Sequence, residues 1–299
     1  KLARLMPMAY LFTVITILIF SCNSRTKNVT PWVELFDGKT LNGWNHLGGE
    51  ATYSVQDEAI IGTSKLNTPN TFLVTDNLYK DFILELEYKV DSKLNSGIQI
   101  RSNSLPQYQN GRVHGYQIEI DPSKRAWSGG IYDEGRRDWL YNLKKNPEAQ
   151  KAYKQNDWNH YRIEAIGDTI KTWINDVPAA YLVDDYTSSG FIGLQVHDIA
   201  GKKEKEGTQV AWRNIKIITQ NVENYAKKSN LEPRLLINNL SLQEKEKGWK
   251  MLWDGTSTNG WRGAKLDKFP ESRWEIENGV LTVLASGGQE STNGGDIVT

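Results

Sequence analysis

The sequence predicts an all-β protein built as a sandwich of two antiparallel sheets. Seven segments between residues 31 and 220 alternate apolar and polar residues, and a period of two is the side-chain period of a β-strand. Clusters of Gly, Asn, Asp and Pro separate these segments, as is typical of turns between neighbouring antiparallel strands. Short strands at regular spacing, with little helical periodicity, favour a sandwich over an α/β fold.

The predicted strands follow one another along the chain. They are FILELEYKV (82–90), SGIQIRS (96–102), GYQIEID (115–121), HYRIEAIG (160–167), TIKTWIND (169–176), FIGLQVHD (191–198) and VAWRNIKII (210–218). In each, one face packs in a core while the other meets solvent or a ligand. One helix is predicted at residues 146–154, because Asn146 is a good N-cap and Pro147 suits the first helical position.

The composition argues against nucleic acid as a partner. The chain carries 36 basic and 36 acidic residues, so its formal net charge is zero, whereas neutralising a phosphate backbone needs a basic excess. Eleven of the residues are Trp; such rings anchor β-sheet cores and can also stack on sugar rings. The motifs of phosphate-binding loops, serine hydrolases and zinc proteases are absent from the sequence.

Residues 1–22 resemble a lipoprotein signal peptide. Thirteen uncharged residues (8–20) follow Lys1 and Arg4, too few for a spanning helix of about 20 residues but typical of a signal-peptide core. IFSC at 19–22 resembles a bacterial lipoprotein box in which Cys22, the sole cysteine, is lipidated. We expect residues 23–30 to be a tether. The protein would then be exported and held to the membrane of a bacterial cell envelope by its lipid anchor.

A repeat indicates the domain plan. Three stretches return later in the same order: LFDGKTLNGW (35–44) as LWDGTSTNGW (252–261), YSVQDEAIIG (53–62) as WEIENGVLTV (274–283), and TFLVT (71–75) as GDIVT (295–299). We therefore expect a first module at 31–220, a linker at 221–248, and the start of a second, truncated module at 249–299.

Several motifs in this order resemble the DUF1080, or 3-keto-disaccharide hydrolase, family. They are LFDGKTLNGW, NSGIQIRS, GYQIEID, GGIYDEGRR, WNHYRIEAIGDTIKTWINDV and GFIGLQVHD. The resemblance covers residues 31–220 and the partial second copy. It implies a concanavalin A-like jelly-roll sandwich of two curved antiparallel sheets. It also implies hydrolysis or elimination of glycosides whose sugar has first been oxidised to a 3-keto form by a separate oxidoreductase.

Polar residues mark the outward faces of three predicted strands, 96–102, 115–121 and 191–198. The inward positions there are apolar, and the outward polar residues are Gln99, Arg101, Gln117, Glu119, Asp121, Gln195 and His197. A solvated sheet face would usually carry Lys, Thr and Ser, which are missing from this set. If the strands are neighbours, we expect one ligand-binding surface.

This surface could carry out acid–base chemistry. A ketone at C3 acidifies the C2 proton, so His197 or Glu119 could be the base, with Arg101 at the enolate oxygen or on sugar hydroxyls. Glu119 and Asp121 are ~6–7 Å apart along the strand at about 3.3 Å per residue. They could form an acid–base pair or hold a divalent metal, and no other cofactor is indicated. The amides Gln99, Gln117 and Gln195 would bind substrate.

The segment WSGGIYDEGRRDWLY (127–141) is predicted to be a loop rich in acids, arginines and aromatic residues. Its Glu134, Arg136 and Arg137 could clamp a sugar, with Tyr132, Trp127 or Trp139 stacking on the ring. The alternative is a rim loop whose charges pair among themselves.

Two further interpretations stay open. Glu119-Ile120-Asp121 is similar to the carboxylate pattern of retaining glucanases, but Ser123 stands where a second Glu would be wanted. The module could also be a non-catalytic carbohydrate-binding domain in which Trp and Tyr carry the affinity, or an adhesion module on a lipid tether.

Overall fold

The computed structural model describes residues 31–236, 240, 247–277, 279–284 and 295–299. The chain divides into two units, residues 1–31 and 32–299. The predicted signal peptide, Cys22 and the tether at 23–30 lie outside the described residues. Within the described ranges, no helix has the length and apolar character needed to cross a membrane.

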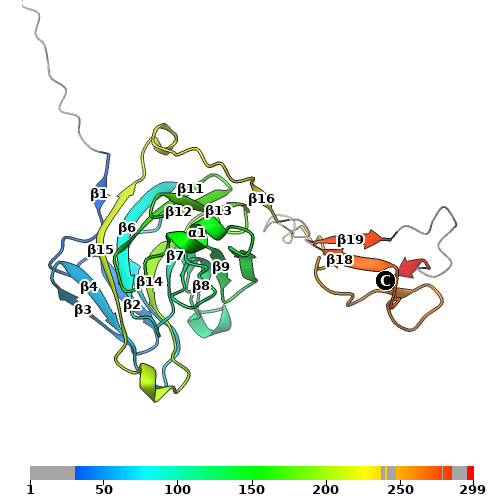
Figure 1. The fold of residues 1–299 in the computed structure, drawn as a ribbon, viewed down its shortest axis with the longest axis horizontal. Coiled ribbons are helices and arrows are strands. Elements are labelled where there is room, and N and C mark those ends of the chain that lie inside the picture. Colours follow the sequence, from blue (N-terminus) through cyan, green and yellow to red (C-terminus); the bar gives the residue numbers. More distant parts are fainter. Residues whose placement is uncertain (1–30, 237–239, 241–246, 278, 285–294) are drawn as a thin grey trace, which may run out of the picture. The chain divides into compact units, whose positions relative to one another are not determined.

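Two sheets form the main domain (Figure 1). The larger is nine-stranded, in the order β16-β13-β12-β11-β6-β15-β4-β3, with β1 also paired to β15. Its strands are β1 (Val33–Glu34), β3 (Thr52–Gln56), β4 (Ala59–Thr63), β6 (Phe82–Val90), β11 (Asn159–Ile166), β12 (Thr169–Ile174), β13 (Val177–Val183), β15 (Gln209–Ile218) and β16 (Arg234–Leu235). All its pairs are antiparallel except β13 with β16.

The second sheet is seven-stranded, in the order β10-β9-β8-β7-β14-β5-β2, and every pair in it is antiparallel. Its strands are β2 (Trp44–Gly48), β5 (Thr71–Thr75), β7 (Ser96–Asn103), β8 (His114–Ile120), β9 (Ile131–Glu134), β10 (Asp138–Tyr141) and β14 (Phe191–Val196). The three strands that carry the polar outward residues, β7, β8 and β14, are neighbours, as the predicted surface requires.

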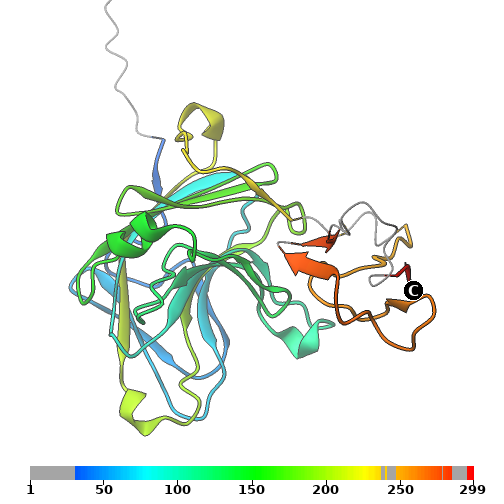
Figure 2. The same cartoon turned by 45° about the vertical axis from the view of Figure 1, so that its right-hand side comes forward.

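One apolar core lies between the two sheets (Figure 2). Ile98 and Ile118 of the seven-stranded sheet and Leu84 and Ile163 of the nine-stranded sheet are fully buried in it. The predicted inward positions on β7, β8 and β14 all face this core, and none is more than 1% exposed. Burial of these alternating positions confirms the predicted all-β sandwich.

The helix α1 (Pro147–Ala152) confirms the predicted capping residues. Asn146 accepts a hydrogen bond at its Oδ1 from the backbone N–H of Ala149 at 3.2 Å. Its Nδ2 donates to the carbonyls of Pro178 and Ala179 on β13, at 2.9 and 3.1 Å. The cap therefore also fixes the helix to the sheet. Short 3-10 helices occur at Gln109–Gly111, Lys203–Lys205 and Val222–Asn224.

We expect Asn146→Ala to lower the free energy of unfolding by about 1–2 kcal/mol, because both the cap and the bonds to β13 are lost. Urea denaturation checks this. Lys151→Ala, which removes an exposed cation of the same helix, is the control and should change stability by less than about 0.5 kcal/mol.

The sequence predicted a loop at 127–141, but the structure has two strands in this segment. Most of it forms a hairpin in which β9 and β10 meet through Gly135 and two arginines, and this hairpin extends the seven-stranded sheet at its edge. The sequence did not predict these strands, because each has only four residues and the charged residues in and between them obscure the alternation of apolar and polar positions. The hairpin places Tyr132 opposite Gln117 of β8, so both side chains lie on the same sheet face.

In the described part of residues 249–299 the structure contains two small two-stranded sheets. One pairs β17 (Arg262–Gly263) with β20 (Ile297–Val298), and the other is a hairpin of β18 (Trp274–Glu277) and β19 (Val280–Val283). The pairing Arg262↔Val298 matches Asn45↔Val74 of β2 and β5 under the sequence repeat.

The turns of the repeat also share their hydrogen bonds. Asp254 Oδ1 accepts the N–H groups of Thr256 and Ser257 at 2.8 and 2.7 Å, and Asp37 Oδ1 accepts those of Lys39 and Thr40 at 2.8 and 2.7 Å. The indoles of Trp261 and Trp44 each donate at 2.8 Å to the carbonyl nine residues earlier. From these matched contacts we propose that residues 249–299 repeat the β1–β5 region as the start of a second module.

Candidate functional site

A polar hollow of about 320 Å³ lies on the outward face of the seven-stranded sheet. Its walls come from β8, β9 and β10, from the residue after β14, and from four loops. The lining residues are Asn70, Asn95, Arg112, Gln117, Glu119, Arg125, Tyr132, Glu134, Trp139 and His197. Five of these were predicted from the sequence as binding or catalytic residues: Gln117 and Glu119 on this sheet face, and Tyr132, Glu134 and Trp139 in the segment 127–141. His197 is a sixth.

Sheet register explains why these side chains meet. Gln117 of β8 is paired with Tyr132 of β9, and Tyr132 with Trp139 of β10. On the other side Gln117 is paired with Gln99 of β7. Directly opposed residues in antiparallel strands project to the same face. The four side chains therefore form one row across four strands, with the aromatic residues at the sheet edge.

Glu119 is the buried acid of the hollow, only 4% exposed. Its Oε1 accepts from Asn95 Nδ2 at 2.7 Å and from Arg125 Nη2 at 3.3 Å, and its Oε2 accepts from Gln117 Nε2 at 3.0 Å. Burial raises the pKa of Glu119 to about 7, against the opposing effect of the two amide donors. The carboxyl group is thus poised near neutral pH, the condition that suits proton transfer.

A chain of side-chain hydrogen bonds orients this carboxylate. Ser102 Oγ donates to Gln99 Oε1 at 2.7 Å, Gln99 Nε2 donates to Gln117 Oε1 at 2.6 Å, and Gln117 then donates to Glu119. Gln99 is fully buried and is not among the residues lining the hollow. Its predicted binding role is therefore replaced by a role in orienting Gln117.

Gly97 makes room for Gln117. A Cβ at position 97 would lie 2.4 Å from Gln117 Cδ, far inside contact distance. We expect Gly97→Ala to displace the Gln117 amide and to remove a hydrogen bond that lowers the pKa of Glu119. The pKa of Glu119 then rises further, so the midpoint of the pH–rate profile moves upward. A midpoint identical to that of the wild type contradicts this arrangement.

Arg125 is a site residue that the sequence analysis missed. Its guanidinium lies 4.6 Å from the ring centre of Trp127 and 4.9 Å from that of Trp139. It pairs with Glu119 and, through Nε, with Asp121 Oδ2 at 2.7 Å. The spacing of four residues between Asp121 and Arg125 was the signal available in the sequence. Asn70, Asn95 and Arg112, in other loops, gave no signal of comparable strength.

Asp121 supports the loop after β8 and does not line the hollow. It is 2% exposed and accepts from the backbone N–H groups of Ser123 and Trp127, at 3.1 and 3.2 Å, besides Arg125. Although burial opposes it, these hydrogen bonds lower the pKa of Asp121. An anion held so firmly is a poor proton donor, so the predicted Glu119–Asp121 acid–base pair is replaced by a positioning role for Asp121.

His197 and Glu134 also line the hollow. His197 Nδ1 lies 2.6 Å from the Asp198 carbonyl, which can only accept, so Nδ1 carries a hydrogen, and the neutral form of the ring has its lone pair on Nε2. Glu134 is 6% exposed, and its Oε1 accepts from Arg112 Nη2 at 3.3 Å and from Asn70 Nδ2 at 3.5 Å. The hollow therefore holds two carboxyl groups, an imidazole and two guanidinium groups.

Arg101 lies outside the hollow, contrary to the prediction that it meets an enolate. The register of β7 shifts between Ile100 and Asn103, and Arg101 itself has a φ of 45°. This bulge breaks the alternation on which the prediction relied. The side chain is 1% exposed and donates to the Lys80 and Gly167 carbonyls, both at 2.8 Å. Arg101 thus joins two loops.

Two other predicted binding residues also lie elsewhere. Arg136 is paired with the buried carboxylate of Asp133 at 2.5 Å and does not line the hollow. Gln195 is fully buried on β14, and neither polar atom of its side chain has a hydrogen-bond partner. The sequence also suggested that Glu119 and Asp121 could hold a divalent metal. Among the described residues, no group of three or more His, Cys, Asp or Glu side chains is placed to bind a metal ion.

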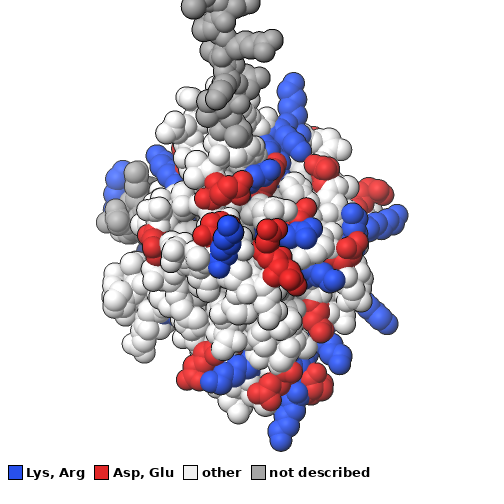
Figure 3. Space-filling model, turned by 90° about the vertical axis from the view of Figure 1, so that its left-hand side faces the viewer, with Lys and Arg blue, Asp and Glu red and all other residues white. Residues whose placement is uncertain are grey.

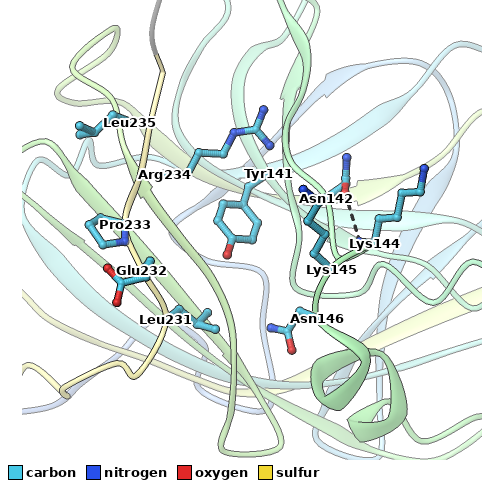
Figure 4. A pocket seen from close by; sticks show the side chains of 10 residues that line it. All are labelled: Tyr141, Asn142, Lys144, Lys145, Asn146, Leu231, Glu232, Pro233, Arg234 and Leu235. Atoms are coloured by element: carbon cyan, nitrogen blue, oxygen red, sulfur yellow. Dashed lines mark hydrogen bonds between the residues drawn. The ribbon is translucent and has the colours of Figure 1, made fainter. Parts of the chain in front are cut away.

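A larger hollow of about 710 Å³ lies between the loop after β10 and the segment that includes β16 (Figure 4). Lys144, Lys145 and Arg234 line it with Tyr141 and one exposed acid, Glu232. Its charged lining residues are all exposed, unlike the buried Glu119 of the first hollow.

On the face of the molecule in Figure 3, acidic and basic side chains are interspersed, without the single-sign field that favours nucleic acid.

The fold and this hollow define a β-sandwich with a polar hollow and a buried carboxyl group on the outward face of one sheet. The chain belongs to the family of 3-keto-α-glucoside-1,2-lyase-like domains, whose family model matches residues 31–218. A curated 3-keto-disaccharide hydrolase from Bacteroides thetaiotaomicron is 38% identical over 64 residues, or 21% of this chain. The match spans only 22% of that relative's length.

Solved structures similar to this chain include a candidate glycosyl hydrolase from Parabacteroides distasonis, with 16% identity and a TM-score of 0.47 over 64% of this chain and 94% of that one. A carbohydrate-binding module from Bacillus subtilis has 17% identity and a TM-score of 0.43 over 59% and 95%. A galectin-like protein from Bacillus subtilis has 11% identity and a TM-score of 0.46 over 60% and 90%.

Proposed function

We propose that the domain cleaves 3-keto glycosides by removing the C2 proton with Glu119. The single observation that carries this proposal is the burial of the Glu119 carboxyl group in a polar hollow, with a pKa raised to about 7. Family membership supports this substrate class, and a buried carboxyl group of raised pKa is suited to the proton removal that this class requires.

The steps balance as follows. Glu119 takes the C2 proton, and the C2–H electron pair forms an enolate with the C3 ketone. The enolate then collapses, C1=C2 forms, and the C1–O bond breaks, so that the leaving oxygen departs with its electron pair and takes up a proton. Adding water across C1=C2 completes hydrolysis, and releasing the unsaturated sugar completes elimination.

Arg125 takes the role that the sequence had suggested for Arg101. Its guanidinium lines the hollow beside Glu119 and can neutralise charge that develops on the enolate oxygen. His197, with its lone pair on Nε2, is suited to exchange a proton with water or the leaving group. Trp139 and Tyr132 form an aromatic wall against which a sugar ring can stack.

The substrate requires a preceding oxidation. A glycoside carrying a ketone at C3 arises when an oxidoreductase removes hydride and proton from the C3 alcohol. We propose that such an enzyme acts before this domain, and that both work outside the cytoplasm, as expected for a lipid-anchored protein.

The test is hydrolysis of a 3-keto disaccharide beside its unoxidised parent, with the full chain as enzyme. We expect turnover of the keto sugar alone, because only the ketone acidifies the C2 proton. Cleavage of both sugars at similar rates contradicts elimination and favours glucanase-type chemistry.

The aromatic wall also supports a second candidate function, that of a carbohydrate-binding module. In that case neither sugar turns over, and calorimetry detects saturable sugar binding that survives Glu119→Gln but weakens with Trp139→Ala. Stacking on one aromatic residue is worth about 1–2 kcal/mol, or roughly tenfold in affinity.

A further inference from the structure

A second hollow of about 560 Å³ adjoins the first. It is bounded by the ends of β2 and β5, by the loop that contains the 3-10 helix Gln109–Gly111, and by the residues after β14. The two hollows share four lining residues: Asn70, Arg112, Glu134 and His197. Because these side chains line both hollows, the hollows adjoin one another, and the four shared residues mark the junction between them.

The two compartments differ in chemistry. Glu119, Arg125 and Gln117 line the first compartment alone. The second instead contains Phe72 and Val113, which are 3% exposed and belong to one apolar cluster on this sheet face. Its remaining walls are polar. Away from the four shared residues, a compartment with an apolar floor and polar walls is suited to holding a ring.

We propose that the second compartment binds the leaving group of the glycoside, so that the bond to be broken lies at the junction. This inference rests on the proposed function, which puts the C2 proton at Glu119. The leaving oxygen is on C1, the carbon next to C2, so the group beyond it can extend from Glu119 into the adjoining compartment. The second compartment would then favour glycosides whose leaving group is a ring over glycosides with a small leaving group.

The junction residues fit this placement. Glu134 is held by Arg112 and Asn70, and Asn70 Oδ1 also accepts the backbone N–H of Asp198 at 2.8 Å. His197, next to Asp198, reaches the same junction with its ring. The carboxyl group of Glu134 and the imidazole of His197, which line both compartments, thus lie where a proton would be exchanged with the leaving oxygen.

The experiment compares two substrates that share the 3-keto sugar, a disaccharide and its methyl glycoside. Gln109→Trp places a large ring in the second compartment, at an exposed position. The backbone φ there is 45°, and because glutamine and tryptophan both have a Cβ, the substitution adds no new backbone strain. We expect the ratio of kcat/KM values, disaccharide over methyl glycoside, to fall about tenfold, equivalent to about 1.4 kcal/mol. Lys144→Trp, outside both compartments, is the control and should leave the ratio unchanged.

Affinity gives a readout that does not depend on turnover. In the Glu119→Gln background, calorimetry should show that Gln109→Trp weakens binding of the disaccharide about tenfold more than binding of the methyl glycoside. Parallel losses for both ligands, or no loss for either, overturn the assignment. If the wild-type chain cleaves neither keto sugar, the proposed function fails. Selective weakening of disaccharide binding then still supports the second compartment as a ring-binding site.

Discussion

Glu119→Gln is expected to reduce turnover of a 3-keto disaccharide by about 10²–10⁴-fold, the usual contribution of a positioned general base. Glutamine keeps the size of the side chain and can still accept from Asn95 but cannot take a proton. Steady-state kinetics at pH 7.5 measures the loss, with Glu148→Gln, on the exposed face of α1, as the matched control. In the wild type the rate should rise as pH increases through about 7, because the base must be ionised.

The same variant should gain stability at alkaline pH. The pKa of Glu119 is about 7 in the folded protein, against an ordinary value of 4.5. For a raised pKa, the stabilising contribution is fully present below pH 4.5 and is lost as pH rises through about 7. At 1.36 kcal/mol per pKa unit, this loss is on the order of 3 kcal/mol above pH 8.

Glutamine resembles the neutral acid at all pH values. Urea denaturation should therefore find Glu119→Gln equal to the wild type at pH 4 and more stable by up to about 3 kcal/mol at pH 8. An equal stability difference at both pH values is incompatible with a buried acid of raised pKa.

Asp133→Ala is expected to lower the free energy of unfolding by about 3–5 kcal/mol, because it leaves buried cations without their partner. Asp133 is fully buried, and its Oδ1 accepts from Arg136 Nε at 2.8 Å while its Oδ2 accepts from Arg137 Nε at 2.5 Å. Arg137 also donates to Asp184 Oδ2 at 2.6 Å, which connects the β9–β10 hairpin to the loop after β13.

Thermal and urea denaturation measure this loss. Asp185→Ala, an exposed acid one residue from Asp184, is the control and should change stability by less than about 0.5 kcal/mol. On β9, Asp133 lies between Tyr132 and Glu134, which line the hollow. We therefore expect substrate affinity to fall along with stability. A loss below about 1 kcal/mol would falsify the view that this ion cluster holds the hairpin.

Alternation alone was enough to predict most of the sandwich and part of its site. Ile98, Ile118 and Leu194 are buried where the period of two placed them, and Glu119 and His197 project from the opposite face. Strand residues are predictable in this way because one register satisfies a buried face and a slip by one residue exposes it.

The rest of the site depended on features that a single sequence does not display. The bulge at Arg101 reverses the alternation locally, so a residue predicted for the site lies among loop carbonyls instead. Arg125 comes from a loop whose course is set by hydrogen bonds to Asp121. The charge-rich hairpin is held by the ion cluster around Asp133, whose link from Arg137 to Asp184 joins residues 47 positions apart in the sequence.

The most direct test of the account follows the C2 hydrogen of the substrate. A 3-keto disaccharide labelled with deuterium at C2 should be cleaved more slowly by the full chain than the unlabelled sugar. Its product should lose the label to solvent, and Glu119→Gln should prevent that loss. Turnover at equal rates for both sugars, with deuterium retained at C2 in the product, would show that this proton is never removed and that the bond is broken by another route.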